Sequence, residues 1–473
     1  MNKKRWIITA AIAVVVVAVI VVCFLCCGRK NHSYCSVVPK DAKALARVDV
    51  TGFMKKHHID LEDVLGAGEL FIQNSGIDVE LPFYVFVTPK EATGVVLPVK
   101  DSGKLKTMLS TYGEMLNIKL SEKQGYNWME MGDAIGCFDN TRMLILMGGG
   151  MNARKILLTL MEQNEEESIM GTTLYSNVEK LDKPLAMVLP LEESLTKGKT
   201  LVGNGVDIKP ECLDADVAVT FDIQGSEAIF AIDLVLNTEE MKNYIYIAEH
   251  EDKLKKIDGT FVAQGMSHPL VWGSLSFDGS KITPEMLESI KAIKELADIA
   301  GLDKALTSLR GDISFSYGDD KVLVQANVAD NHLLALADNV KALTGGQLEA
   351  TKLTNNTYCI GKGDEPIFIG QKDNTFYVSN SGEMNALVGK KAESSLVSKL
   401  GDIKECYFYV SCDVQQLLAV MQKADPNMKS SLLLMGSRLK ELDQLTLRCP
   451  ELTHAELVLS VKDGADFVEK MFK

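Results

Sequence analysis

The chain has 473 residues, of which 46 % are hydrophobic and 24 % charged, so it can bury a sizeable core and is not disordered as a whole. Its formal net charge is −14, and its seven histidines are scattered. Because nucleic-acid binding requires a basic surface, we do not expect nucleic acid as a partner. Only 12 prolines are present, which excludes a long proline-rich stalk.

The first element in the chain is an apolar segment. Residues 7–27 are 21 consecutive uncharged residues, and a helix needs about 20 mainly apolar residues to cross a bilayer. Three basic residues precede the segment, and Trp6 stands at its border, where an interfacial anchor is expected. We therefore predict a cytoplasmic tip and transmembrane anchor in residues 1–30, with residues 31–473 outside the cytoplasm, in the periplasm.

Two other interpretations of this segment stay open. A cleaved signal peptide has a shorter apolar stretch, about 7–15 residues, and small residues at the cleavage site. A lipoprotein needs a cysteine that follows a small residue and a leucine-like one, and neither Cys26 nor Cys27 has this context. All three interpretations export residues 31–473. This part has 45 basic and 64 acidic side chains, a net charge of −19, because five basic and no acidic residues precede it.

The remaining elements are predicted from hydrophobic periodicity. Most apolar runs are short and alternate with polar residues, which is typical of antiparallel sheets with one covered face. Strands and helices mix without a strict β-α-β order, which favours an α+β fold class. In chain order we expect a strand at 83–88, helices at 101–116 and 151–163, strands at 185–189, 217–223 and 229–236, a helix at 283–298, strands at 313–317 and 322–327, a helix at 330–342, a strand at 407–411, and helices at 413–424 and 428–442.

The body of the chain contains an internal repeat. Asp-Asn-Thr, a glycine and Met-Asn-Ala occur in this order in residues 139–153 and, with one gap, in residues 373–386. Three weaker matches keep the same order, with offsets between 219 and 234 residues. We therefore predict two related lobes, residues 36–255 and 256–473, each with mostly antiparallel sheets flanked by helices. Each repeated segment predicts a turn, a strand, a second turn and a helix, because Asp and Asn favour turns.

Cysteine usage does not indicate a disulfide framework. The seven cysteines beyond the predicted anchor are widely spaced and form no Cys-x-x-Cys motif, whereas small secreted scaffolds are much richer in cysteine. Several stand in apolar runs, as Cys137 and Cys406 do, and buried free cysteine behaves as a small hydrophobic residue. Structural thiols are favoured, with one or two long-range disulfides left open.

A family resemblance rests on three short segments. Val-Pro-Lys-Asp-Ala at 38–42 is followed by a strand that ends in Val-Asp, then by Gly-Ile-Asp at 76–78 and Pro-Phe-Tyr-Val-Phe at 82–86. With these segments the chain resembles an envelope family of Bacteroidetes known as domain of unknown function 4836, over most of residues 36–473. The resemblance implies export, by a lipoprotein signal or a membrane anchor, and no activity, catalytic residue or ligand. The poor lipoprotein signal here favours the anchor.

Metal binding has one candidate cluster. His57 and His58 precede three carboxylates, Asp60, Glu62 and Asp63, and these residue types bind Zn²⁺. Adjacent residues on a helix point about 100° apart, and no His-Glu-x-x-His motif is present. A solvated helix end is therefore the favoured interpretation, and no metal site is predicted.

Other motifs are incomplete. The acidic run Glu165–Glu167 lacks the EF-hand pattern for Ca²⁺, and the glycine-rich segments at 148–150 and 203–205 lack the lysine of a phosphate-binding loop. Gly389-Lys390 lacks the first glycine of such a loop, and a Gly-x-Ser-x-Gly nucleophile motif is absent. The apolar run at 432–435 is better explained by core packing than by a partner groove. No catalytic, cofactor-binding or metal-binding residue is therefore predicted, and no cofactor.

The functional hypothesis that remains is a non-enzymatic binding or scaffolding role in the cell envelope, with an envelope protein as partner. It rests on the anchor, the repeat and the lack of recognisable catalytic motifs. A hydrolase of envelope glycans or peptides is the alternative, because two well-placed carboxylates suffice and 64 acidic residues offer many pairs. A metal-dependent sensor using His57 and His58 is a third hypothesis. The oligomeric state is left open.

Overall fold

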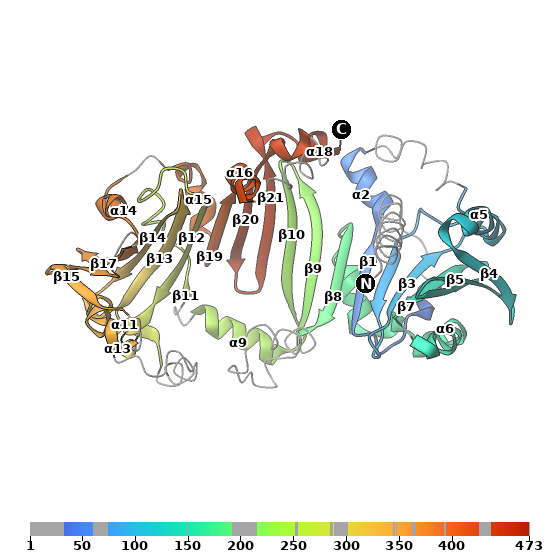
Figure 1. Ribbon diagram of the computed structural model, residues 1–473. Helices are drawn as coiled ribbons and strands as arrows, with labels where there is room; N and C mark the ends of the chain where they lie inside the picture. The colour runs from blue at the N-terminus through green and yellow to red at the C-terminus, as the bar shows by residue number, and fades with distance from the viewer. Residues whose placement is uncertain are drawn as a thin grey trace. The chain divides into compact units, whose positions relative to one another are not determined.

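The computed structural model describes residues 33–59, 74–148, 150–191, 215–250, 254–283, 287, 301–343, 346, 348–361, 366–391, 394–424 and 437–472. These residues form 21 strands of antiparallel sheet, joined by short helices and turns (Figure 1). The predicted α+β class with two related lobes is therefore wrong, and the chain is mostly β.

The error in fold class has a physical cause in the turns. Gln124 and Gly125 have φ angles of 55° and 80°, and Asp319 and Asp320 have 50° and 57°. Two consecutive left-handed residues make the tight turn that matches the twist of a β-hairpin. Gln-Gly and Asp-Asp are not the usual sequences for such a turn. The strands at 118–123 and 126–131, which the Gln-Gly turn joins, were therefore not predicted. The helix expected at 330–342 is in fact three short pieces, α12 (His332–Ala335), η7 (Leu336–Asn339) and α13 (Val340–Leu343).

The chain divides into two compact units. Among the described residues, unit 1 contains those up to 191 together with 215–225 and 467–472, and unit 2 contains 226–466. The predicted lobes, 36–255 and 256–473, stay a prediction. Within the described part of the chain, no helix has the length and apolar character that a membrane crossing requires. The anchor predicted at 7–27 lies outside that part.

Unit 1 has nine strands, in the order β9-β8-β1-β2-β3-β7-β6-β5-β4. The strands are β1 (Ala44–Val48), β2 (Phe83–Val87), β3 (Thr93–Pro98), β4 (Ile118–Lys123), β5 (Tyr126–Met131), β6 (Ala134–Phe138), β7 (Arg142–Met147), β8 (Leu185–Pro190) and β9 (Ala215–Gln224). Its α-helices are α2 (Val50–His57), α5 (Ser102–Leu116), α6 (Ala153–Glu162), α7 (Thr173–Lys180) and α18 (Phe467–Phe472), and its 3₁₀-helices are η1 (Ser33–Val37), η2 (Gly150–Asn152), η3 (Glu165–Glu167) and η4 (Ile169–Gly171).

Unit 2 has twelve strands, in the order β10-β21-β20-β19-β12-β13-β14-β18-β17-β16-β15, with β11 beside β12. The strands are β10 (Glu227–Leu236), β11 (Leu254–Lys255), β12 (Val271–Asp278), β13 (Leu309–Gly318), β14 (Lys321–Val328), β15 (Ala350–Thr354), β16 (Thr357–Ile360), β17 (Ile367–Lys372), β18 (Thr375–Ser379), β19 (Phe408–Asp413), β20 (Leu442–Glu451) and β21 (His454–Val461). Besides α12, η7 and α13, the helical elements are α9 (Glu239–His250), η6 (Gly279–Lys281), α11 (Leu302–Thr307), α14 (Gly382–Leu387), η8 (Val397–Lys399), α15 (Leu400–Lys404), α16 (Val414–Ala424), η9 (Ser437–Glu441) and η10 (Lys462–Gly464).

The strand order of unit 1 occurs again in unit 2. In unit 1, β1 lies between β8 and β2, and in unit 2, β12 lies between β19 and β13. Likewise β7 lies between β3 and β6, and β18 lies between β14 and β17. The repeated segments 139–153 and 373–386 therefore contain strands with equivalent neighbours.

Both repeated segments form the predicted turn, strand, turn and helix. In unit 1 the Asp139 carboxylate accepts the backbone N–H groups of Thr141 and Arg142 at 2.7 and 3.0 Å, and β7 and α6 follow. In unit 2 Asp373 takes the left-handed conformation, with φ of 52°, before β18 and α14. Ser381 caps α14 by accepting the Met384 N–H. This local prediction is confirmed.

The cores lie where helices and loops cover the sheets. In unit 1, α6 buries Leu157, Leu160 and Met161. In unit 2, the rings of Trp272 and Tyr409 lie 6.2 Å apart within a buried apolar cluster. Each fully buried side chain of this size contributes about 1.5–3 kcal/mol to folding. The apolar stripe of α6 thus fixes the helix, and with it the side chains on its remaining faces.

Candidate functional site

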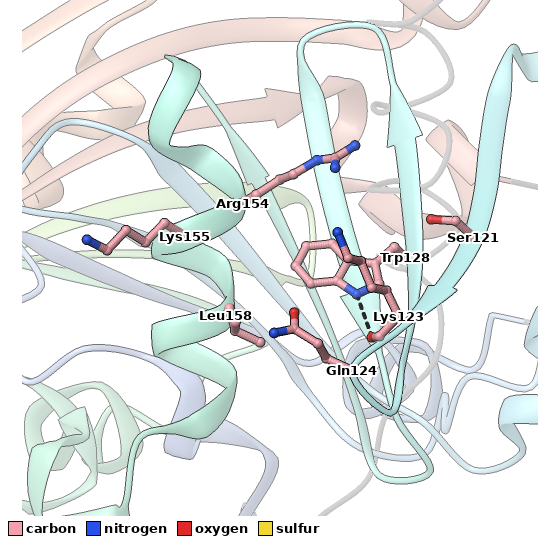
Figure 2. A pocket seen from close by; sticks show the side chains of 7 residues that line it. All are labelled: Ser121, Lys123, Gln124, Trp128, Arg154, Lys155 and Leu158. Atoms are coloured by element: carbon pink, nitrogen blue, oxygen red, sulfur yellow. Dashed lines mark hydrogen bonds between the residues drawn. The ribbon is translucent and has the colours of Figure 1, made fainter.

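A hollow of about 250 Å³ opens in unit 1 between the β4–β5 hairpin and helix α6 (Figure 2). Strand β4, the hairpin turn and β5 supply one side, and the first two turns of α6 supply the other. We call it the hairpin pocket. Its lining residues are Ser121, Lys123, Gln124, Trp128, Arg154, Lys155 and Leu158.

The hairpin places its lining residues by register. Ser121 is paired directly with Trp128 and Lys123 with Tyr126, so alternate residues of β4 and β5 point to the face that carries α6. The left-handed Gln124-Gly125 turn closes the hairpin. The Trp128 indole N–H donates to the Lys123 carbonyl at 3.0 Å, and the indole is only 7 % exposed. The ring is therefore a fixed wall whose single polar group is already used.

Helix α6 places its lining residues by helical spacing. Arg154 and Leu158 are four residues apart, so they lie on one face, toward the hairpin. Figure 2 shows Arg154 reaching over toward the hairpin, whereas the amino group of Lys155 runs away from Trp128 in this view. The left-handed glycines Gly148 and Gly150, with φ of 83° and 56°, let the chain turn from β7 into α6.

The charges around the pocket are mostly positive. The Arg154 guanidinium forms an ion pair with Glu130 of β5 through its Nη2 atom. Lys123 and Arg154 exceed this one carboxylate by one positive charge, in a chain whose net charge is −14. Arg154 and Lys155 also occupy the first turn of α6, which has no acidic residue. The helix dipole disfavours cations there, so an anion bound beside them would remove a repulsion.

The pocket combines three kinds of surface. Trp128 and Leu158 are apolar, Lys123 and Arg154 are cationic, and Ser121 with Gln124 offers neutral hydrogen-bonding groups. Pockets that bind small molecules typically pair apolar walls with a few placed polar groups. None of the seven lining residues is a carboxylate or a histidine. The arrangement can bind and orient an anion.

The two adjacent histidines considered as metal ligands have structural roles. His57 ends α2, with Nε2 3.7 Å from an Asp222 oxygen, and His58 is its left-handed C-cap, whose N–H bonds to the Met54 carbonyl. Burial alone would raise the pKa of Asp222, but hydrogen bonds from Lys56 and Lys183 outweigh it and lower the pKa. The predicted partners Asp60, Glu62 and Asp63 lie outside the described residues. Among those described, no three His, Cys, Asp or Glu side chains are grouped as metal ligands.

The other sequence candidates also lie apart from the pocket. Glu165–Glu167 form the exposed turn η3, capped by Asn164. Gly389 is left-handed and lies against Lys372, while 203–205 and 432–435 are outside the described residues. The six cysteines in the described ranges are free thiols. Burial raises the pKa of Cys137 to about 12, so this thiol stays protonated at neutral pH.

Among the described residues of unit 2, the carboxyl groups of Asp258 and Asp312 lie close together. Burial and the neighbouring Asp258 raise the pKa of Asp312 to about 6. Asp312 is fully buried, and its two oxygens accept the backbone N–H groups of Asp258, Gly259 and Thr260 at 2.8–3.1 Å. Burial would also raise the pKa of Asp258, but hydrogen bonds from Asp312 and Thr260 lower it. The backbone hydrogen bonds that Asp312 accepts hold the loop before β12 in place, and both of its oxygens are used in them.

The pocket residues were missed by sequence reasoning for a clear reason. Gln-Gly is not a usual turn sequence, so it does not predict the hairpin that brings Lys123 beside Trp128. No known sequence motif includes these residues. One signal was available: after Met-Asn-Ala, the first repeated segment continues with Arg154-Lys155 and the second with Leu387-Val388. Two cations in place of two apolar residues, at the start of a helix, indicate a change of role.

The chain belongs to an uncharacterised protein family. The matching family is described as "Domain of unknown function (DUF4836)", and its model covers residues 72–447. No curated protein matches the sequence. Among solved structures, crystal form I of TP0453 shares 10 % identity with a TM-score of 0.30, covering 46 % of this chain and 85 % of that one. Crystal form III of TP0453 gives 10 %, 0.30, 47 % and 88 %. Likeness this low supports no statement about the fold or function of this chain.

Proposed function

We propose that the protein is a membrane-tethered binding protein of the cell envelope, with residues 31–473 outside the cytoplasm, and that it holds a small anionic ligand in the hairpin pocket. The observation that carries this proposal is the excess of cations over carboxylates beside a buried indole, where Lys123 and Arg154 face the single carboxylate of Glu130, in an otherwise acidic chain. Like-charged side chains cost free energy when they are brought together, so a counter-ion from outside the protein would stabilise the group.

Binding is favoured over catalysis by the chemistry of the lining residues. Their cations, amide and hydroxyl can position an anion, but they offer no acid–base pair poised near neutral pH. The hydrolase alternative needs two carboxylates facing an open cleft, and Asp312, with its partner Asp258, is committed to the loop before β12. The tether is supported by the 21 uncharged residues at 7–27.

Native mass spectrometry tests the binding function. Full-length protein is purified from its own envelope in mild detergent, beside a Lys123→Glu, Arg154→Glu double variant. We expect a small bound mass on the wild type that the double variant loses, with similar urea unfolding midpoints for the two proteins. A bound mass shared by both proteins, or by neither, would contradict a ligand in this pocket.

Protease accessibility tests the tether and its orientation. Intact cells, cells with a permeabilised outer membrane and lysed cells are treated in parallel, with detection of the carboxyl-terminal part. We expect digestion of residues 31–473 before the inner membrane is opened, and release from the membrane only with detergent. Protection until full lysis would place the body in the cytoplasm and overturn the orientation.

A further inference from the structure

We infer that the hairpin pocket binds one sugar-sized ring that carries a carboxylate, that is, a single acidic sugar unit. This inference rests on the proposed binding function and names the chemical class of its ligand. It follows from the size of the pocket, from the division of its lining into apolar, neutral and cationic parts, and from the directions in which Arg154 and Lys155 point (Figure 2).

The pocket has room for one ring. A volume of about 250 Å³ equals the share of roughly eight water molecules, at about 30 Å³ each. That space suits a single six-membered ring with its substituents. Because Ser121, Lys123 and Gln124 are exposed at the mouth, the ring can still be part of a longer chain that extends into solvent.

The walls match the two faces of a sugar. The indole of Trp128 has already given its N–H to the Lys123 carbonyl, so it presents only apolar surface, and Leu158 adds to that surface. The C–H groups of a sugar ring pack well against such a wall. Ser121 and Gln124 supply hydroxyl and amide groups for the ring hydroxyls. An acid with a purely apolar body would offer no hydrogen-bonding partner to the Ser121 hydroxyl or the Gln124 amide.

The cations select an acid over a neutral sugar. Lys123 comes from β4 and Arg154 from α6, and Figure 2 shows Arg154 reaching across the pocket toward the hairpin that carries Lys123. The ion pair with Glu130 engages Nη2 of Arg154, and the guanidinium has further N–H donors in its fork. A planar carboxylate is the natural partner for such a fork, through charge-assisted hydrogen bonds. Lys155 is the internal comparison, because it shares the helix turn but points away.

Three small probes distinguish this ligand class from its rivals. Full-length protein in detergent is titrated with methyl β-glucuronide, with methyl β-glucoside and with acetate, followed by calorimetry and by tryptophan fluorescence. The first two differ only in the carboxylate, and acetate is the carboxylate without the ring. We expect the glucuronide to bind at least about tenfold more tightly than either comparison, and to weaken as NaCl rises from about 0.05 to 0.5 M.

Variants assign the effect to the pocket. Lys123→Gln and Arg154→Gln are each expected to weaken glucuronide binding about tenfold, the loss of one charge-assisted hydrogen bond. The matched control Lys155→Gln removes a charge of the same sign from the same helix turn, and should stay within about twofold of wild type. Trp128→Phe should reduce the fluorescence response, and its urea unfolding midpoint reports whether the fold is kept. If that variant unfolds, the glutamine variants, at exposed positions, still decide the question.

Several outcomes would overturn the inference. Equal binding of glucuronide and glucoside removes the role of the carboxylate, and equal binding of glucuronide and acetate removes the role of the ring. An equal loss in Lys155→Gln and Arg154→Gln would mean that only overall charge matters. Failure of all three probes excludes acidic sugars, whereas the proposed binding function fails only if native mass spectrometry also finds no pocket-dependent ligand.

Discussion

The two copies of the repeated segment use one scaffold in opposite ways. In unit 1, Ala153 is followed by Arg154 and Lys155, which are exposed. In unit 2, Ala386 is followed by Leu387 and Val388, which pack into a cluster with Leu323, Tyr377 and Met384. The strands before these helices, β7 and β18, have equivalent neighbours. The residues after Met-Asn-Ala therefore begin a helix and carry charge in unit 1, whereas in unit 2 they end a helix and pack in the core.

The aromatic ring beside each helix explains how this exchange is tolerated. In unit 2 the Tyr377 ring of β18 lies over Gly370 of β17, where a Cβ atom would come within 2.3 Å of it. In unit 1 the ring comes from the hairpin, as Trp128, opposite Cys137 of β6. In unit 1 the ring therefore comes from β5 of the hairpin, whereas in unit 2 it comes from the central strand β18. The charged residues at the start of α6 are exposed and do not belong to the core. The difference shows that the residues after Met-Asn-Ala are core residues in unit 2 and surface residues beside a pocket in unit 1.

The largest expected effect comes from exchanging a residue between the two copies. Val388→Lys places an ammonium group at a position that is fully buried and already close to Lys372, whose Nζ bonds to the Val388 carbonyl at 2.9 Å. We expect a loss of about 3–5 kcal/mol in the free energy of unfolding, measured by urea denaturation, because an unpaired charge is buried. A loss below about 1 kcal/mol would show that this helix end is not a core element.

A second prediction compares the loop before β1 in unit 1 with the loop before β12 in unit 2. In unit 1 the Tyr34 hydroxyl donates to the Pro82 carbonyl, a contact without an acidic group, whereas in unit 2 Asp312 holds the loop. The pKa of Asp312 is raised to about 6, above its unfolded value near 3.9, so its stabilising contribution is complete below about pH 4 and is lost as pH rises through about 6. We expect a loss of about 2 kcal/mol over that range.

Urea unfolding at pH 4, 5, 6 and 7 measures this effect, with Asp312→Asn as the comparison that cannot titrate. The difference between the two proteins should change with pH. Asp258 has a lowered pKa, so its own contribution is lost only as pH falls below about 4. A pH-independent difference between wild type and variant would show that Asp312 is not the titrating group.

A smaller effect is expected where β10 pairs with β21. It adds a second pH range, above that of Asp312, over which the stability of unit 2 changes. His454 lies between Asp233 and Glu456, with contacts of 2.6 and 3.0 Å. Burial lowers the pKa of His454, but the hydrogen bonds that its ring donates to both carboxylates outweigh this effect and raise the pKa. Its contribution is therefore complete below about pH 6.5 and is lost as pH rises further. We expect His454→Gln to cost about 1 kcal/mol at pH 6 and less at pH 9, by urea unfolding.

The smallest expected effect comes from the reverse substitution, at the matching position of the first repeated segment. Lys155→Val gives the first copy the residue type of the second, at an exposed position where the helix dipole disfavours a cation. We expect the free energy of unfolding to change by less than about 0.5 kcal/mol. Thermal unfolding of the variant beside wild type checks this, and a large loss would mean that Lys155 has a structural partner.

Much of the fold was accessible from the sequence, but its class was not. Alternating runs identify strands such as β13 and β14, and the repeated Asp-Asn-Thr and Met-Asn-Ala segments identify equivalent turns and helices. The turn at Gln124-Gly125 carries a weak signal, so the β4–β5 hairpin was not predicted, whereas the strands on both sides of Asp319-Asp320 were. The only signal for the pocket was Arg154-Lys155 after Met-Asn-Ala, because Trp128 and Arg154 line one pocket only through the register of the hairpin and the position of α6.

The pairing of β10 with β21 has a consequence for how this chain can be divided. These are the last strands of the two repeated series, and seven consecutive residues of β10, Glu227–Asp233, are paired with β21. A fragment that ends at residue 255 keeps β10 but loses this partner, and leaves a row of backbone N–H and C=O groups on a strand rich in Ile, Phe and Val. Such an edge recruits other chains and promotes aggregation. A fragment intended to be soluble should therefore not end at residue 255, although the repeated sequence suggests that boundary.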